Sequence, residues 1–307
     1  MRSLKYLVLL VVWYPLREVI RLCTTKRGAY RPLLWIGNLL GTLYYLLSGR
    51  GRRIATDVFA RLGLLLPGVV RKTFQALARR EVEGMVQEDL NRELIERITV
   101  FEGLEHLDAA LAKGRGAIMV LFHFGWHMHL FSALGFLGYP IHQVFFPRDE
   151  ARGGMHPLER LLRERQRRNA RNLPVTFHKA GGLLRDIYTL LAANEVLMVT
   201  IDGRAAKSFD AFPFLAGQIH LSPTIFKILP RTGSPVLPLF TYLGEDGRHR
   251  VIAHPAVTAT EPTAILAEIV TLFEGYVRER PEQYGAYLLL CEAARAAGDG
   301  SAPLVTF

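Results

Sequence analysis

The 307-residue sequence has little cysteine, fewer acidic than basic residues and no long apolar run. Its two cysteines, Cys23 and Cys291, cannot form a disulfide framework, and neither belongs to a CxxC pair. This argues against a disulfide-stapled secreted scaffold and against a cysteine zinc site. We therefore predict a reducing, cytoplasmic environment.

The shortage of acidic residues leaves the chain strongly basic. Twenty-eight Asp and Glu stand against 38 Lys and Arg, which gives a net charge of +10. Such a charge favours anionic partners: nucleic acid, an anionic membrane surface or an acidic carrier protein. No zinc-finger spacing or aromatic RNA-binding signature is present, and the mean hydropathy is slightly positive at +0.16. A membrane surface is therefore the favoured partner, and nucleic acid is not expected.

The longest N-terminal apolar run, residues 7–14, is far shorter than the roughly 20 residues that a spanning helix needs. Arg2, Lys5 and Arg17 flank it, and no small-residue cleavage site of a signal peptide follows. We favour a helix that dips into the bilayer or lies on it. A buried N-terminal helix and a longer, tilted span remain alternatives.

Residues 1–98 are predicted to form a helical, basic segment apposed to a membrane. An apolar helix with two glycines is expected at 33–47, and basic clusters follow at 50–53 and 71–80. Clusters of this kind are usually solvated helix faces, and contact with anionic lipid is the second interpretation.

From residue 99 to residue 307, strand-like segments alternate with helical ones. The segment 98–107 is strand-like and then turns, and short apolar strands are expected at 116–124, 139–146, 173–179, 195–201 and 234–243, with VIAHPAV at 251–257 after them. Helices are expected between them at 107–113, 130–137, 157–171, 183–194, 221–232 and 263–279. This alternation predicts a second, α/β domain with a mixed, largely parallel sheet flanked by helices.

Two polar residues follow buried strands of this predicted sheet. His123 ends the run GAIMVLF, and Asp202 ends the run EVLMVTI. Functional residues collect beyond the C-terminal ends of parallel strands, so we expect these two side chains at one edge of the sheet.

Three histidines crowd the segment that begins at His123: His123, His127 and His129. Residues four apart on a helix can share a zinc ion, as in HExxH proteins. Here no glutamate lies between them and no third ligand is evident, so a metal site is the less favoured alternative. We favour a catalytic role for His123, assisted by neighbouring side chains, over a metal site.

The segments EGLEHLDAALAKGRGAIMVLFHFG, GYPIHQVFFPRD, HPLERLLRERQRRN, LLRDIYTLLAANEVLMVTIDGR and FPFLAGQIHLSPTIFKILPRTGSPVLPLF, followed by PEQY at 281–284, carry a resemblance over about residues 95–285. In order and spacing they resemble the bacterial lipid A biosynthesis acyltransferases, the late lauroyl and myristoyl transferases, and relatives that acylate phosphatidylinositol mannosides. The resemblance implies an α/β fold of the glycerolipid-acyltransferase type and transfer of a fatty acyl chain.

The resemblance also implies roles for single residues. His123 would be the general base that deprotonates an acceptor hydroxyl, Arg167 would hold a phosphate or an oxyanion, and Asp202 stands at the aspartate of the family. The family carries an acid five residues after the histidine, where this chain has Met128. If the turn is one residue shorter, His127 takes that place; otherwise Asp202 or the backbone alone would hold His123.

The chain also departs from the lipid A enzymes after PEQY, where GAYLLLCEAARAAG replaces an arginine-rich ending. This puts a lipid A acceptor in doubt. We expect substrate contacts from a set of aromatic, glycine and arginine residues: Phe122, Phe124, Gly125, Trp126, Arg148, Arg204, Phe212 and Phe214.

The sequence therefore predicts an acyltransferase that uses an acyl thioester on acyl carrier protein or coenzyme A, a lipid-like acceptor and no cofactor. It would act at the cytoplasmic face of a bacterial inner membrane. The alternative is a protein that keeps the fold and binds lipid or acyl carrier without catalysis.

Overall fold

The computed structural model describes most of the chain outside the N-terminus and the segment after the third strand. The described residues are 15, 18–19, 30–145, 173–179, 184–203, 206, 208–296, 298 and 303–306. The apolar run 7–14, the arginine-rich segment 157–171 and residues Arg148, Arg167 and Arg204 lie outside them.

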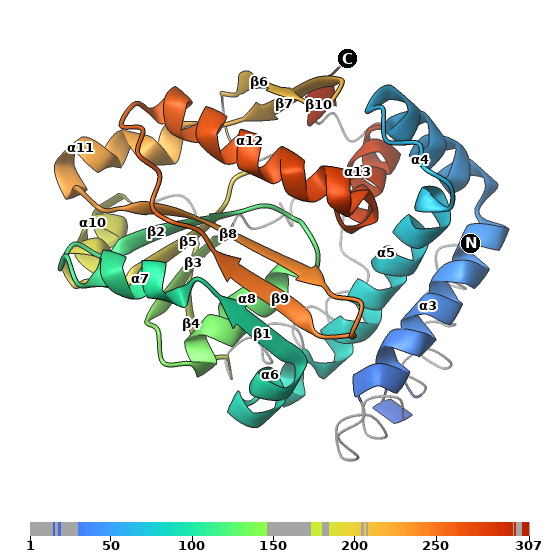
Figure 1. Ribbon diagram of the computed structural model, residues 1–307, viewed down its shortest axis with the longest axis horizontal. Coiled ribbons are helices and arrows are strands. Elements are labelled where there is room, and N and C mark those ends of the chain that lie inside the picture. Colours follow the sequence, from blue (N-terminus) through green and yellow to red (C-terminus); the bar gives the residue numbers. More distant parts are fainter. Residues whose placement is uncertain are drawn as a thin grey trace.

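The centre of the molecule is a seven-stranded sheet with the order β1-β9-β8-β2-β5-β3-β4 in the described part of the chain (Figure 1). Its strands are β1 (Thr99–Glu102), β2 (Ala117–Leu121), β3 (Ile141–Phe145), β4 (Val175–Lys179), β5 (Val196–Thr200), β8 (Val236–Leu243) and β9 (His249–Ala253). Strands β8, β2, β5, β3 and β4 run parallel, and only the β8–β9 pairing is antiparallel. The expected α/β fold with a largely parallel sheet is confirmed.

Strand β2 is buried on both faces because helices cover both sides of the sheet. Ile118 and Val120 pack into one apolar cluster with residues of α10 (Leu184–Ala192) and α12 (Pro262–Glu279). The alternate positions Ala117, Met119 and Leu121 pack into a second cluster with residues of α7 (Leu104–Leu111) and α8 (His127–Phe136). A continuous apolar run is what such a two-sided burial requires.

Helices α3 (Tyr30–Leu47), α4 (Gly49–Arg61), α5 (Val69–Val86) and α6 (Arg92–Ile98) precede the sheet. Helix α3 packs along α5, and α4 and α5 pack against α13 (Pro281–Arg295) near the opposite end of the sequence (Figure 1). No helix within the described residues has the length and apolar character needed to cross a bilayer.

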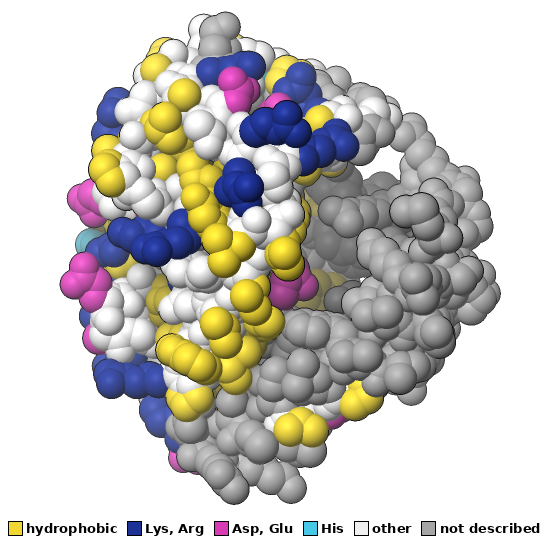
Figure 2. Space-filling view, turned by 90° about the vertical axis from the view of Figure 1, so that its right-hand side faces the viewer, with side chains coloured by type: hydrophobic (Ala, Val, Ile, Leu, Met, Phe, Trp, Pro, Cys, Tyr) yellow, Lys and Arg dark blue, Asp and Glu magenta, His cyan; other side chains and the backbone are white. Residues whose placement is uncertain are grey.

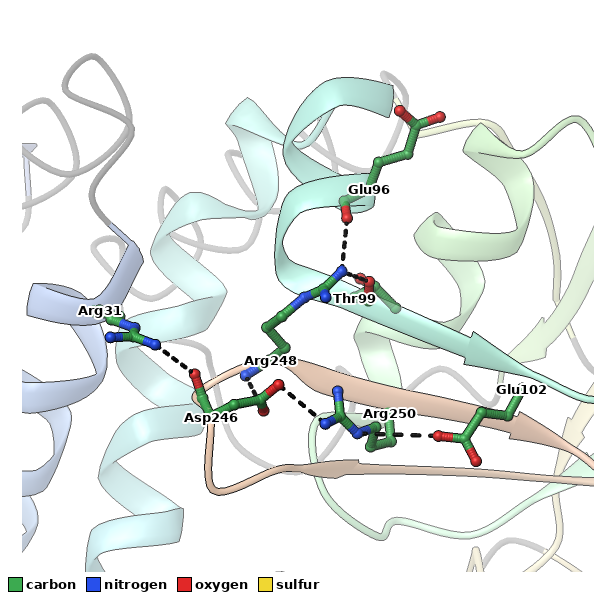
Figure 3. A network of polar contacts seen from close by, with 7 residues as sticks. All are labelled: Arg31, Glu96, Thr99, Glu102, Asp246, Arg248 and Arg250. Carbon is green, nitrogen blue, oxygen red and sulfur yellow. Dashed lines mark hydrogen bonds and ion pairs between the residues drawn. The ribbon is translucent and has the colours of Figure 1, made fainter.

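Arginines join this helical part to the β8–β9 hairpin (Figure 3). Arg31 of α3 donates to the backbone oxygen of Asp246 at 3.2 Å, and Arg250 donates to the Asp246 carboxylate at 3.0 Å. Arg248 donates to the backbone oxygens of Glu96 and Thr99, at the junction of α6 and β1. The β8–β9 hairpin is thereby hydrogen-bonded to α3 on one side and to α6 on the other.

A second, three-stranded sheet occupies a region where the sequence predicted a loop and a helix over 221–232. It consists of β6 (Asp210–Phe214), β7 (Gly217–Leu221) and β10 (Val305–Thr306). The helical part begins only at Thr224, as the 3-10 turn η3 (Thr224–Ile228) and the short α11 (Leu229–Thr232). Pro223 is the residue before η3, and Pro230 lies in the first turn of α11. Proline is tolerated at the start of a helix but not in its interior, so these two residues limit where the helices can begin.

Candidate active site

The polar residues that follow β2 and β5 lie side by side at one edge of the sheet. These strands pair in parallel with Leu121 opposite Thr200. Two further residues in the same register bring His123 opposite Asp202, as the strand ends led us to expect.

The Asp202 carboxylate accepts hydrogen bonds from His123 in two ways. Its Oδ1 lies 2.7 Å from the imidazole Nδ1. The backbone N–H of His123 donates to Oδ2 at 3.0 Å and to Oδ1 at 3.2 Å. The Asp202 side chain is fully buried, whereas 24% of the His123 side chain is exposed. The acid is therefore fixed inside the protein and the imidazole reaches the surface.

This contact sets the tautomer of His123. A carboxylate only accepts hydrogen bonds, so the hydrogen of a neutral imidazole must be on Nδ1. The lone pair is then on Nε2, on the opposite side of the ring. The pair can position a base and can stabilise the imidazolium that forms when Nε2 takes up a proton.

Tyr287 of α13 covers the imidazole. Its ring stacks on His123 with centroids 4.1 Å apart and an angle of 12°, and its hydroxyl donates to the backbone oxygen of Asp202 at 3.0 Å. Tyr284, one turn earlier, is buried; burial and the charge of Asp202 raise the pKa of its hydroxyl well above the usual value. The sequence drew attention to PEQY at 281–284 but not to Tyr287, although helical spacing from Tyr284 would have placed it on the same face.

The other two histidines of the segment have different surroundings. The His127 ring meets His123 edge-on with centroids 4.5 Å apart. Burial, followed by the charges of His123 and Arg80, lowers the pKa of His127 well below its usual value. His129 turns away: its Nε2 lies 2.7 Å from Oγ1 of Thr99. No group of three or more His, Cys, Asp or Glu side chains that could hold a metal ion occurs in the described part of the chain.

Residue 128, where the acid was expected from the resemblance, carries an apolar side chain that packs against the core. Met128 lies against two apolar clusters, one on the sheet and one formed with α3 and α5. The carboxylate that contacts the imidazole comes from Asp202 instead.

The aromatic residues expected to contact substrate lie in the core below the site. Phe122, Phe124 and Phe214 surround Phe273 of α12, and the Phe122 and Phe273 rings stack with centroids 3.7 Å apart. Phe212 is buried in the same cluster. Their part in holding an acyl chain stays a prediction.

Gly125 and Trp126 form the turn between His123 and α8. Gly125 has a positive φ of 58°, and a Cβ there would lie 2.3 Å from the backbone oxygen of Thr241. Only glycine fits this close approach. Trp126 is buried and stacks on His129. The turn that carries His123 is thus packed rigidly against β8 and the core.

A family model described as bacterial lipid A biosynthesis acyltransferase matches residues 67–288. The matched part runs from just before α5 into α13 and contains His123, Asp202 and Tyr287. A comparison with curated proteins gave no match.

Proposed function

The chain belongs to the bacterial lipid A biosynthesis acyltransferase family, and from this premise we propose that it transfers a fatty acyl chain from an acyl thioester to a lipid-like acceptor. Acyl carrier protein or coenzyme A would carry the thioester, and a hydroxyl or amine would accept the chain. The observation that carries the proposal is the 2.7 Å contact between Asp202 and Nδ1 of His123, because it leaves Nε2 as a base at the surface.

In the proposed reaction, Nε2 of His123 takes the proton of the acceptor hydroxyl while its oxygen attacks the thioester carbonyl carbon. The carbon–oxygen bond forms, the carbon–sulfur bond breaks, and the departing thiolate takes the proton back from the imidazolium. Asp202 keeps the ring oriented and offsets its positive charge during the step. The thioester is itself activated, so this step calls for no metal or organic cofactor.

Several residues enter the proposal as expectations from the sequence. Arg167, for a phosphate or an oxyanion, and Arg148 and Arg204, for substrate, lie outside the described residues. The role of Arg167 rests on the family resemblance, whereas Arg148 and Arg204 are expected substrate contacts. His127 would take the place of the family's acid if the turn is one residue shorter.

The alternative function is binding of lipid or acyl carrier without catalysis. Met128 favours it, because a thioether cannot orient an imidazole or stabilise its charge. The position of Asp202 favours catalysis, because a buried carboxylate on Nδ1 does both.

We place the protein at the cytoplasmic face of a bacterial inner membrane. Exposed Trp35, Leu39 and Leu43 on α3, together with the basic charge of the chain, support contact with a bilayer. The N-terminal apolar run would add a second contact.

Intact-lipid mass spectrometry tests the function in strains that lack the protein, carry it, or carry His123→Ala at matched abundance. We expect one lipid species to gain an acyl chain only with the unchanged protein. His106→Ala, on helix α7, is the matched control and should behave like the unchanged protein.

Purified protein supplies the second arm, with acyl carrier protein and coenzyme A thioesters offered separately. Loss of acyl transfer in His123→Ala with retention in His106→Ala would support catalysis. Equal transfer by His123→Ala and the unchanged protein would remove His123 as the base. Thioester binding without any transfer would favour the binding function.

A further inference from the structure

A small cleft lies behind the turn that carries His123. Gly125 and Trp126 of that turn form one wall, and Arg79, Arg80 and Glu83 of α5 form another, with Gln283 of α13 between them. It is partly open to solvent, and the space at its base holds about one water molecule.

Arg80 is the unusual residue of this cleft. Its Nη1 is buried and has no hydrogen-bond partner within the described residues. Burial lowers the pKa of Arg80, but a guanidinium stays charged at neutral pH. A buried N–H donor without a partner is costly, and in a folded protein it calls for a specific explanation.

Three carboxylates lie near enough to attract the charge of Arg80: the exposed Glu81, and then Glu83 and Asp202, which are hydrogen-bonded to other residues. The Asp202 carboxylate accepts hydrogen bonds from His123. Glu83 accepts from the Tyr30 hydroxyl at 2.6 Å and lies 3.0 Å from Nε2 of His249. Arg79 adds a second positive charge to the cleft, with one nitrogen donating to Asn38. Among the residues that line the cleft, two arginines therefore stand against one glutamate.

We propose that Arg80, supported by Arg79, binds a phosphate group of one of the two substrates and so holds that substrate beside His123. Guanidinium groups are suited to phosphate, because their N–H groups match its oxygens in pairs. This subsite rests on the proposed acyl transfer for its purpose, although phosphate binding can be measured without it. Phosphate of the thioester carrier and phosphate of the acceptor share this chemistry, and the kinetic arms below separate them.

The binding experiment measures Tm of the full-length protein with inorganic phosphate, against sodium chloride at equal ionic strength. We expect phosphate to raise Tm of the unchanged protein and to lose this effect in Arg80→Gln. Arg71→Gln is the matched control, because Arg71 is an exposed arginine of the same helix. Without phosphate, Arg80→Gln should change stability little, since it removes a buried N–H donor without a partner but also the attraction to Glu81, Glu83 and Asp202. Equal phosphate effects in the unchanged protein and Arg80→Gln, or none in either, would overturn the subsite.

The kinetic experiment compares KM and kcat of Arg80→Gln with those of the unchanged protein. A rise in KM of roughly 10- to 100-fold for coenzyme A thioesters, but not for a short thioester without phosphate, assigns the subsite to the donor. A rise confined to a phosphorylated acceptor assigns it to the acceptor. A lower kcat with unchanged KM for both substrates means that Arg80 acts on the reacting atoms, and the phosphate subsite is then wrong. Loss of phosphate stabilisation in a protein that transfers no acyl chain would leave the subsite standing and remove the proposed function.

Discussion

At the scale of single residues, the orientation of the His123 imidazole depends on which residue supplies the carboxylate beside it. Asp202 follows a neighbouring strand, whereas the family resemblance led us to expect an acid five residues after the histidine, at Met128. Asp202 accepts both from the imidazole and from the backbone N–H of His123. The strand register therefore fixes the distance between the two residues.

Asp202→Asn should lower kcat by roughly 10²–10⁴-fold, because an amide in this place no longer stabilises the imidazolium and permits the wrong tautomer. Met128→Glu in the otherwise unchanged protein should not raise kcat, since Nδ1 already has its acceptor. Steady-state kinetics of both variants is the measurement. A kcat for Asp202→Asn within a factor of two of the unchanged protein contradicts the assigned role.

The buried histidines give the protein an acid-sensitive stability. Burial, and then the charge of His249, lowers the pKa of His129 well below its usual value; His127 shifts in the same direction. Below about pH 6.5 the unfolded chain takes up protons that these two side chains refuse in the folded state. Their stabilising contribution is complete above that pH and is lost as the pH falls.

We therefore expect the free energy of unfolding to fall below about pH 6.5, by up to about 1.4 kcal/mol per pH unit for each of the two histidines. His129→Gln should remove one such contribution from the slope. Thr99→Val, which removes only the hydrogen-bond partner of His129, should lower stability without changing the slope. Urea unfolding at several pH values measures both, and equal slopes in His129→Gln and the unchanged protein contradict this account.

At the scale of elements, α3 and α5 approach closely because glycines stand between them. A Cβ at Gly41 would lie 2.4 Å from Cα of Gln75, and one at Gly37 would lie 2.9 Å from Cα of Arg79. Glycines four residues apart on one helix face allow two backbones to come together. The spacing of α3 therefore decides where α5 holds the two arginines of the cleft.

Gly41→Val should force the helices apart and lower the free energy of unfolding by about 1–3 kcal/mol, as overpacking generally does. Gly84→Ala is the control, because Gly84 lies in α5 with no atom within 4 Å of an added Cβ. It should raise stability by up to about 1 kcal/mol, since glycine is a poor helix former. Denaturant unfolding compares the two; destabilisation by both variants would mean that helix spacing is not the cause.

The elements also show how much of this molecule the sequence could predict. Strands β2 and β5 are continuous apolar runs, and the positions of their ends in the sequence predict that His123 and Asp202 lie at one edge of the sheet. Strand β6 was missed because Pro213 interrupts it, and proline argues against a strand. Tyr287 contacts a residue 85 positions away, and no local pattern reports such a distance. Arg80 is one of four basic residues between 71 and 80, and within the described residues only its buried Nη1 without a partner distinguishes it.

At the scale of the whole molecule, the side formed by α3 and α4 carries exposed apolar residues beside basic ones (Figure 2). Trp35, Leu39, Leu43 and Leu47 follow one face of α3 at four-residue spacing, and each is at least 45% exposed. The basic residues nearby are Arg50, Arg53, Arg71 and Lys72, all exposed. An apolar helix face with basic residues beside it suits an anionic bilayer, where each basic side chain contributes about 1 kcal/mol.

The triple variant Trp35→Ala, Leu43→Ala and Leu47→Ala should therefore bind vesicles of phosphatidylethanolamine and phosphatidylglycerol at least about 10-fold more weakly, because each side chain removed takes apolar area out of the contact. Co-sedimentation measures the bound fraction. Leu184→Ala is the matched control: this leucine is 57% exposed on α10, across the molecule from α3 (Figure 1). Higher salt should weaken binding of the unchanged protein, since it screens the basic residues. Equal vesicle binding by the triple variant and by Leu184→Ala would mean that α3 does not face the bilayer, and the active site would then need another route to a lipid acceptor.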